Sequence, residues 1–73
     1  MRLYNFEALI DGTVVAAEHA VRLSDPRSVW SEVERLASLH NEPGCRIRVT
    51  DESGRIVVLT GVVSVLCMRG VAA

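Results

Sequence analysis

Apolar side chains at every second position predict that the chain opens with a β-hairpin. The stretch Tyr4–Ile10 places apolar residues on one face of a strand at a period of two. Asp11-Gly12 follows, and this dipeptide favours a type I′ turn because both central positions of that turn need positive φ. Such a turn would bring the apolar sides of both strands together. The predicted cross-strand pairs are Ile10–Thr13, Ala8–Val15, Phe6–Ala17 and Tyr4–His19.

Apolar residues at spacings of three and four then predict one helix. Asp25 suits the N-cap position, where its carboxylate accepts a backbone N–H, and Pro26 suits the first helical position. The apolar stripe of this helix consists of Val29, Trp30, Val33, Leu36, Ala37 and His40. Asn41–Gly44 contains a proline and a glycine, so we expect the helix to end there.

The pattern after the helix predicts a second hairpin. Cys45–Thr50 alternates between apolar residues on an inner side and polar residues on an outer side. Asp51–Gly54 is the predicted loop, with its glycine in a left-handed conformation. The last strand, from Arg55 to about Met68, carries apolar residues on both faces, which is typical of a strand buried on both sides.

These elements predict a two-layer α+β fold of order ββαββ, in which one helix packs on one face of a four-stranded sheet. We expect a single domain over residues 1–73. The first and last strands are the ones expected in the centre of the sheet. The predicted spatial order of the strands is therefore second, first, fourth, third.

Several local patterns along the chain match those of a known family. They are Tyr4-x-Phe6, Asp11-Gly12, Leu23-x-Asp25 and Val49-x-Asp51-Glu52-x-Gly54-Arg55-x-Val57. With these patterns in this order, the chain resembles a group of short bacterial proteins known only as a domain of unknown function. The resemblance implies a ββαββ pattern and no particular activity. At the level of the fold alone, the chain is also similar to small antitoxin-type domains that lay one helix on a β-sheet.

Composition narrows the classes of partner. Hydrophobic residues make up 49% of the chain, which is high for a small domain that must also cover itself with polar surface. The formal net charge of -1 gives no general attraction to nucleic acid or to anionic lipid. The apolar stretch Ile56–Met68 is shorter than the roughly 20 residues of a membrane-spanning helix. We therefore expect no membrane partner, and nucleic acid only as the alternative described below.

The cysteines indicate a reducing compartment. Cys45 and Cys67 are too few for a disulfide framework, and the predicted strands place them too far apart to bond to each other. No basic start followed by an apolar stretch marks a signal peptide. We therefore expect a cytoplasmic protein with both thiols reduced.

No grouping of reactive side chains predicts an enzyme, a metal site or a cofactor site. The candidate metal ligands lie on separate elements, without the close spacing of a zinc site: His19, His40, Cys45 and Cys67. Cys45 comes soon after His40, but it falls on the inner side of its strand, where a thiol usually packs as a small apolar group. Glu7 and Glu18 are expected on the sheet face away from the helix, as solvated carboxylates.

The number of apolar residues predicts self-association, because one helix can cover only one side of the sheet. The residues predicted to face the helix are Phe6, Ile10, Val15, Ile47, Val49, Val57 and Leu59. The residues predicted on the opposite face are Leu3, Leu9, Val14, Ile56, Val58, Val62 and Leu66. Exposed apolar patches beyond a few hundred Å² usually mark interaction sites, so this face predicts a homodimer or a larger homo-oligomer. The predicted function is a non-enzymatic, self-associating protein-interaction module, with another protein as a further partner.

The alternative interpretation uses three arginines. Arg46 and Arg48 lie on one face of a strand and Arg55 begins its partner, so their side chains could contact phosphates as those of a β-ribbon do. No aromatic residue lies between them for base stacking, and Asp51 and Glu52 are close in the sequence. The second predicted function is therefore a nucleic-acid-associated or antitoxin-like small regulator.

Overall fold

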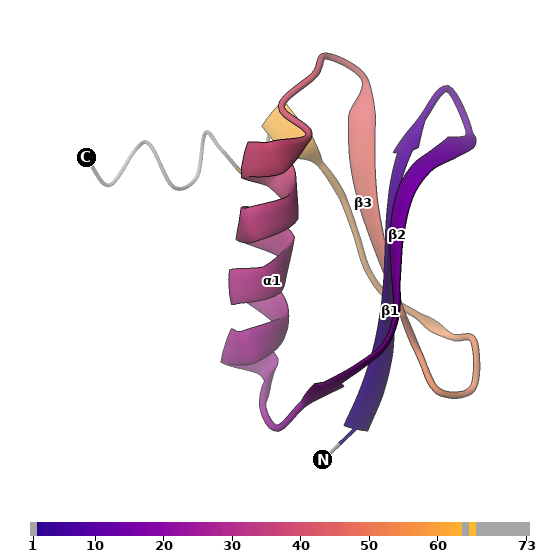
Figure 1. Ribbon diagram of the computed structural model, residues 1–73, viewed down its shortest axis with the longest axis vertical. Helices are drawn as coiled ribbons and strands as arrows, with labels where there is room; N and C mark the ends of the chain where they lie inside the picture. The colour runs from indigo at the N-terminus through magenta and orange to yellow at the C-terminus, as the bar shows by residue number, and fades with distance from the viewer. Residues whose placement is uncertain (1, 64, 66–73) are drawn as a thin grey trace.

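A computed structural model of the protein has two layers, one formed by a helix and one by a sheet (Figure 1). It describes residues 2–63 and residue 65. The elements in chain order are β1 (Arg2–Ile10), β2 (Thr13–Leu23), α1 (Pro26–Leu39), β3 (Cys45–Asp51) and β4 (Ile56–Gly61). The strands form an open antiparallel sheet of four, and α1 lies across one of its faces. The predicted α+β fold of order ββαββ is confirmed.

The order of the strands differs from the predicted one. The sheet runs β2-β1-β3-β4, so β3 lies in the centre beside β1, and β4 lies at an edge. The prediction was wrong because it treated the apolar stretch after Arg55 as one long strand that needed burial on both sides. The strand β4 instead ends at Gly61, and Val62, Val63 and Val65 are helical. The apolar residues of this stretch are thus divided between an edge strand and a helical segment.

The helical segment after β4 contributes to the core. The buried cluster consists of Phe6, Ala8, Val29, Val33, Leu36, Ala37, Cys45, Ile47, Val49, Val62 and Val65. Val62 was predicted on the face away from the helix, and its full burial in this cluster shows that the assignment was wrong. The physical reason is the end of the strand at Gly61, after which the two-residue alternation no longer decides where a side chain points. Leu66, Cys67 and Met68 lie outside the described residues.

The first hairpin has the predicted turn, but the register of its two strands differs from the predicted one. Asp11 and Gly12 have φ values of 52° and 77°, the positive pair that a type I′ turn needs. Ile10 pairs with Thr13 as predicted, and the register then shifts by one residue between Leu9 and Ala8. After this shift the partners of Ala8 and Phe6 are Ala16 and Glu18, and a second shift between Phe6 and Tyr4 pairs Tyr4 with Val21. Val15, predicted to face the helix, is the extra residue of this first bulge and is exposed.

A second bulge in β2 holds Ala20 in a left-handed conformation. Its φ is 56°, and its backbone N–H donates to Asn5 Oδ1 at 3.0 Å. The register shifts again at this point, between the pairs Phe6–Glu18 and Tyr4–Val21. A left-handed conformation costs an L-residue roughly 1–2 kcal/mol, so Ala20 is a strained position. The Asn5 side chain offsets part of that cost.

The helix begins and ends where the sequence predicts. Asp25 Oδ1 accepts the backbone N–H of Ser28 at 2.9 Å and its hydroxyl at 3.3 Å, and Pro26 is the first helical residue. At the other end, the backbone N–H of His40 donates to Leu36 O at 2.9 Å. The buried residues of α1 are Val29, Val33, Leu36 and Ala37.

The cap at Asp25 gives a prediction for stability. Asp25→Ala should lower the free energy of unfolding by about 0.5–2 kcal/mol, because the Ser28 N–H would lose its acceptor. Urea denaturation measures this change. Ser24→Ala, at the exposed neighbouring position, is the control and should leave the free energy of unfolding nearly unchanged. An Asp25→Ala variant as stable as the native chain would contradict the role of the cap.

The bulge at Ala20 gives a prediction of opposite sign. Ala20→Gly should raise the free energy of unfolding by up to about 1 kcal/mol, because glycine adopts positive φ without the penalty that alanine has. Ala17→Gly, an exposed position of the same strand without positive φ, should instead lower it by about 0.5–1 kcal/mol. Thermal and urea denaturation of the two variants distinguish strain from a general effect of glycine. An equal loss of unfolding free energy in both variants would show that Ala20 is not strained.

Candidate protein-interaction surface

The sheet face opposite α1, which we call the open face, carries both apolar and charged side chains. It consists of Leu3, Asn5, Glu7 and Leu9 of β1, Val14, Ala17 and Arg22 of β2, Arg46, Arg48 and Thr50 of β3, and Ile56, Leu59 and Gly61 of β4. The assignment starts from β3, whose buried residues alternate with residues that point the other way. It extends to the other strands because residues directly opposite each other share a face.

An ion pair joins the two central strands on the open face. Glu7 of β1 and Arg48 of β3 are cross-strand partners. Arg48 donates to Glu7 Oε1 from Nε at 2.9 Å and from Nη2 at 2.7 Å. Both side chains are partly buried, which strengthens a charge-assisted hydrogen bond relative to one in open water. The pair therefore fixes the Arg48 side chain on the sheet.

Apolar side chains lie near this ion pair on the open face. Leu9 lies opposite Val14 on one neighbouring strand and opposite Arg46 on the other. Val14, Ile56 and Leu59 are 43%, 54% and 54% exposed. A hollow of about 530 Å³ opens among these side chains and is lined by Leu9, Asp11, Gly12, Gly44, Arg46, Arg48, Ile56 and Leu59. The open face is thus hollowed beside its exposed apolar side chains, and Asp11 and two arginines of β3, Arg46 and Arg48, line the hollow.

The residues predicted for an interface divide between the two faces. Those that lie on the open face are Leu3, Leu9, Val14 and Ile56. Val58 is opposite Val49 and packs against the core, so it faces α1, and its predicted place on the far face was wrong. Val62 is in the core, as described above, and Leu66 lies outside the described residues. Leu59, predicted to face the helix, lies on the open face opposite Arg48.

A bulge near the start of β4 explains these reversals. Thr50 pairs with Ile56, but Val49 pairs with Val58, so Val57 is an extra residue. Because side chains alternate at a period of two, a shift of one residue moves every later side chain to the other face. The sequence of the loop before β4 gives no sign of this bulge. The prediction therefore missed Leu59, and it also missed the Glu7–Arg48 pair because it did not place β1 beside β3.

The three arginines of the alternative function differ in their surroundings. The Arg48 guanidinium forms an ion pair with Glu7. Arg46 is exposed on the open face, and Arg55 is exposed in the second hairpin. Within the described part of the chain, neither of these two side chains has an ion pair or a hydrogen bond. Arg55 does contribute its backbone N–H to Asp51 Oδ1 at 3.0 Å.

That hydrogen bond belongs to the loop between β3 and β4. Asp51 Oδ1 also accepts the hydroxyl and the backbone N–H of Ser53, at 2.7 and 2.9 Å. These bonds, with the Ser53 hydroxyl contributing most, lower the pKa of Asp51 below its ordinary value. Gly54 has a φ of 84°, as the sequence predicts for this loop. Asp51 is therefore a charged turn residue that shapes the loop.

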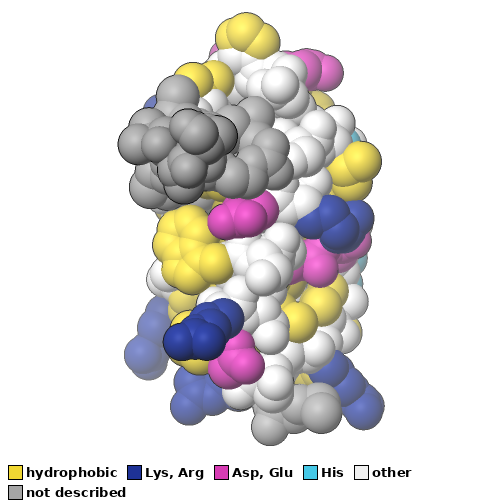
Figure 2. All heavy atoms as spheres, turned by 90° about the vertical axis from the view of Figure 1, so that its left-hand side faces the viewer, with side chains coloured by type: hydrophobic (Ala, Val, Ile, Leu, Met, Phe, Trp, Pro, Cys, Tyr) yellow, Lys and Arg dark blue, Asp and Glu magenta, His cyan; other side chains and the backbone are white. Residues whose placement is uncertain are grey.

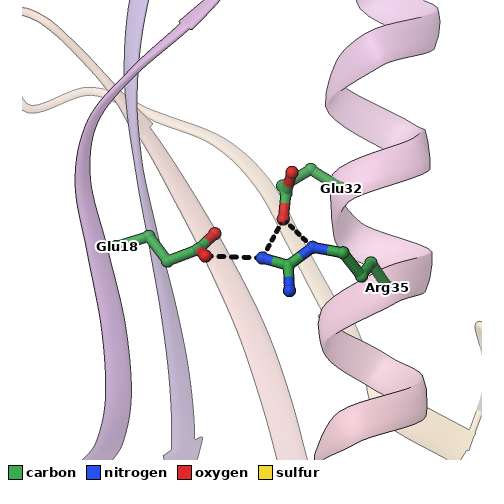
Figure 3. Close-up of polar contacts among 3 residues, drawn as sticks. All are labelled: Glu18, Glu32 and Arg35. Carbon is green, nitrogen blue, oxygen red and sulfur yellow. Dashed lines mark hydrogen bonds and ion pairs between the residues drawn. The ribbon is translucent and has the colours of Figure 1, made fainter.

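A second charged cluster lies on the helix side of the sheet (Figure 3). Arg35 of α1 pairs with Glu32 on the same helix and with Glu18 of β2. The two carboxylates raise the pKa of Arg35, with the larger effect from Glu32. Glu18 was predicted on the same face as Glu7, and this was wrong because the first bulge in β2 turns Glu18 toward α1. The two glutamates therefore cannot act as a carboxylate pair.

The reactive side chains do not form a site in the described part of the chain. Cys45 is buried in the core and free, and its burial, with a smaller contribution from Glu42, raises the pKa of its thiol. A protonated, buried thiol is a poor nucleophile. Over residues 2–63 and 65, no three His, Cys, Asp or Glu side chains are grouped so that they could hold a metal ion. The predicted lack of a bond to Cys67 concerns a residue outside this range.

Trp30 lies at a smaller hollow beside β4. The hollow has a volume of about 240 Å³ and is lined by Tyr4, Pro26, Val29, Trp30, Val57 and Val58. Trp30 is 42% exposed, so it stands at the border of the core. Figure 2 views the molecule from the α1 side and shows exposed hydrophobic side chains there among acidic and basic ones. The hollow on this side is smaller than the one on the open face.

Comparison with protein-family models, with curated proteins and with solved structures found no match. The resemblance to short bacterial proteins of unknown function therefore stays a prediction. Among the helices in the described part of the chain, none has the length and apolar character needed to cross a membrane.

The ion pair on the open face gives a prediction for stability. In a double-mutant cycle with Glu7→Gln and Arg48→Met, we expect a coupling energy of about 0.5–1 kcal/mol, measured by urea denaturation. The coupling should fall as salt is added, because both side chains remain partly exposed. Arg46→Met is the control and should show no coupling to Glu7→Gln, because Arg46 has no ion pair among the residues that the structure describes. A coupling energy of zero at low salt would show that the ion pair does not stabilise the fold.

Proposed function

We propose that the protein is a non-enzymatic, self-associating protein-interaction module that binds a second copy of itself through the open face. The observation that carries the proposal is the exposure of Val14, Ile56 and Leu59 around Leu9, on a face that no described element covers. Burial of apolar surface contributes roughly 25 cal/mol per Å², so covering this face would be favourable. The ion pair of Glu7 and Arg48 adds a satisfied polar centre that need not be broken on association.

Charges on the same face support a two-fold contact. Arg46 and Asp11 line the hollow, and neither side chain has an ion pair within the described part of the chain. In a two-fold arrangement each contact occurs twice, so a second copy can bring an acidic group to each Arg46. Charge complementarity of this kind fixes orientation more than it adds affinity. The apolar side chains would supply most of the binding free energy.

The nucleic-acid-associated or antitoxin-like function is the alternative. It is supported by Arg46 and Arg55, which are exposed and without ion pairs in the described part of the chain. It is weakened by Arg48, whose charge is neutralised by Glu7. Sequence-independent nucleic-acid binding depends on the number of free cationic groups that meet phosphates, so the loss of one of three matters. A cytoplasmic location is also part of the proposal, and the free Cys45 supports it.

The mass of the protein in solution tests the proposed function. In sedimentation equilibrium at micromolar concentration, we expect a mass of at least twice the 8.0 kDa of the chain. Leu9→Lys should reduce it to the mass of one chain, because a buried lysine is costly at the centre of an apolar contact. Val14→Lys, at a more exposed position, repeats the test if Leu9→Lys fails to fold. Ser31→Lys, on an exposed position of α1, is the matched control and should retain the native mass.

Two outcomes would contradict this proposal. One is a well-folded native chain, judged by circular dichroism, that stays at 8.0 kDa throughout the concentration range. The other is a salt-dependent shift with generic DNA or RNA that Arg46→Ala abolishes, which would favour the alternative function. Association that Leu9→Lys and Val14→Lys both leave intact would move the contact away from the open face.

A further inference from the structure

We infer that β4 is a second site of association, at which two copies of the chain pair antiparallel along their β4 strands and join their sheets into one. The inference goes beyond the proposed function, because it uses the backbone of an edge strand and does not need the open face to be covered. Its partner is a second copy of this chain.

The two edges of the sheet differ in how well they resist pairing. Edge strands expose backbone N–H and C=O groups, and proteins protect them with charges, bulges and irregular backbone. The edge strand β2 has such features: Glu18, His19 and Arg22 lie along it, two bulges shift its register, and Ala20 has positive φ. Its edge is also tied to α1 through Glu18 and Arg35. Pairing along β2 is therefore disfavoured.

The other edge strand, β4, has little of this protection. Ile56–Gly61 contains no charged residue and no proline, and its one bulge lies at its start. Ile56, Val57 and Leu59 are exposed large apolar residues on this edge. An exposed apolar edge of this kind is a template for another strand. The asymmetry between the two edges assigns pairing to β4.

The alternation of side chains limits the registers of the pairing. Val58 and Thr60 face α1, while Leu59 and Gly61 lie toward the open face, because of their partners on β3. Residues opposite each other across an antiparallel pair must share a face. A two-fold axis through any one residue of β4 meets this condition, and an axis at Leu59 centres the pairing on the part of β4 that follows the bulge. It sets Leu59 against its copy and Val58 against Thr60 of the other chain. Arg55, just before β4, then lies at opposite ends of the two strands, which keeps the like charges apart.

Among the described residues, apolar side chains flank β4 on both faces of the sheet. Leu59 and Ile56 continue the apolar surface of the open face up to this edge. On the other side, the hollow lined by Trp30 and Val57 lies beside the strand. A ladder this short gives an interface below about 1,200 Å², the size of weak and transient contacts. We therefore expect copies to exchange at micromolar concentration, so the test must trap the pair.

A disulfide at the two-fold axis provides the trap. Leu59→Cys is made in a Cys67→Ala background, in which the remaining native thiol, Cys45, is buried. On mild oxidation, Leu59→Cys should form a covalent dimer about tenfold faster than Val15→Cys in the same background, because opposite residues of a ladder have the Cα separation that a disulfide needs. Val15 is the matched control, since it is an exposed apolar residue of the other edge strand and is not part of the open face. Equal rates for the two variants would overturn the inference.

Two further substitutions separate edge pairing from contact through the open face. Added to Leu59→Cys, Val57→Lys puts a charge on the β4 edge and should slow disulfide formation by about tenfold. Leu9→Lys puts the same charge on the open face and should remove only the trapping that comes from contact through that face, whereas Ser31→Lys, at an exposed position of α1, should leave the trapping rate unchanged. If Leu9→Lys slows trapping and Val57→Lys does not, the contact is face to face, so the edge inference fails while the proposed function stands.

Hydrogen exchange on the unaltered chain covers the case in which a variant fails to fold. Edge pairing would protect backbone N–H groups of β4 that point away from β3, and this protection should grow with protein concentration. Protection of β4 that is the same at about 10 µM and at about 1 mM would also overturn the inference. Concentration-dependent protection of β2, and not of β4, would show that copies pair along the other edge of the sheet and would overturn the inference.

Discussion

The width of the sheet relative to one helix is the constraint on which the rest of this structure depends. Neighbouring strands lie about 4.8 Å apart and a helix with its side chains is about 10–12 Å wide, so one helix covers the middle of four strands but not both edges. The sheet residues of the core accordingly come from the two central strands, with Phe6 of β1 and Ile47 of β3 fully buried. The whole of the open face and the outer part of β4 remain uncovered by any described element.

The two edges of the sheet differ in how they are protected against contact with other chains. The strand β2 bends through two bulges and is connected to α1 by Glu18 and Arg35, so its edge is shaped by polar contacts. The strand β4 is short, and the chain after it turns back so that Val62 fills the core. What is left on β4 is an apolar edge beside an apolar face. Both proposals for association follow from this one distribution of uncovered surface.

Local chemistry explains why much of the fold could be predicted from the sequence. The turn at Asp11-Gly12 and the cap at Asp25 depend on a few neighbouring residues, and both have the predicted geometry. The bulges at Val15 and Val57 could not be predicted, because the residues around them are apolar at successive positions, so the alternation does not mark an extra residue. At Ala8, for example, the small Ala16 lies opposite in the structure where the alternation predicted the larger Val15. A single extra residue then reversed the predicted faces of Val58 and Leu59.

The candidate surface was predictable to the extent that it depends on the first strand. Leu3, Leu9 and Val14 precede or adjoin the well-defined turn, and their predicted face was correct. The contribution of β4 depends on strand order and on a bulge, neither of which leaves a sequence signal. The ion pair of Glu7 and Arg48 was missed for the same reason, since it exists only because β3 lies beside β1. Sequence patterns therefore did not predict which strands that are distant in the chain lie side by side.

Intermolecular nuclear Overhauser effects test most directly whether the uncovered apolar surface is an interface. The sample is an equimolar mixture of isotope-labelled and unlabelled native chain, so that only contacts between copies give filtered signals. This account predicts intermolecular signals from the methyl groups of Leu9, Val14, Ile56 and Leu59, and none from the core methyl groups of Val33 and Ile47. A folded protein that gives no such signals, or gives them only from α1, would contradict it.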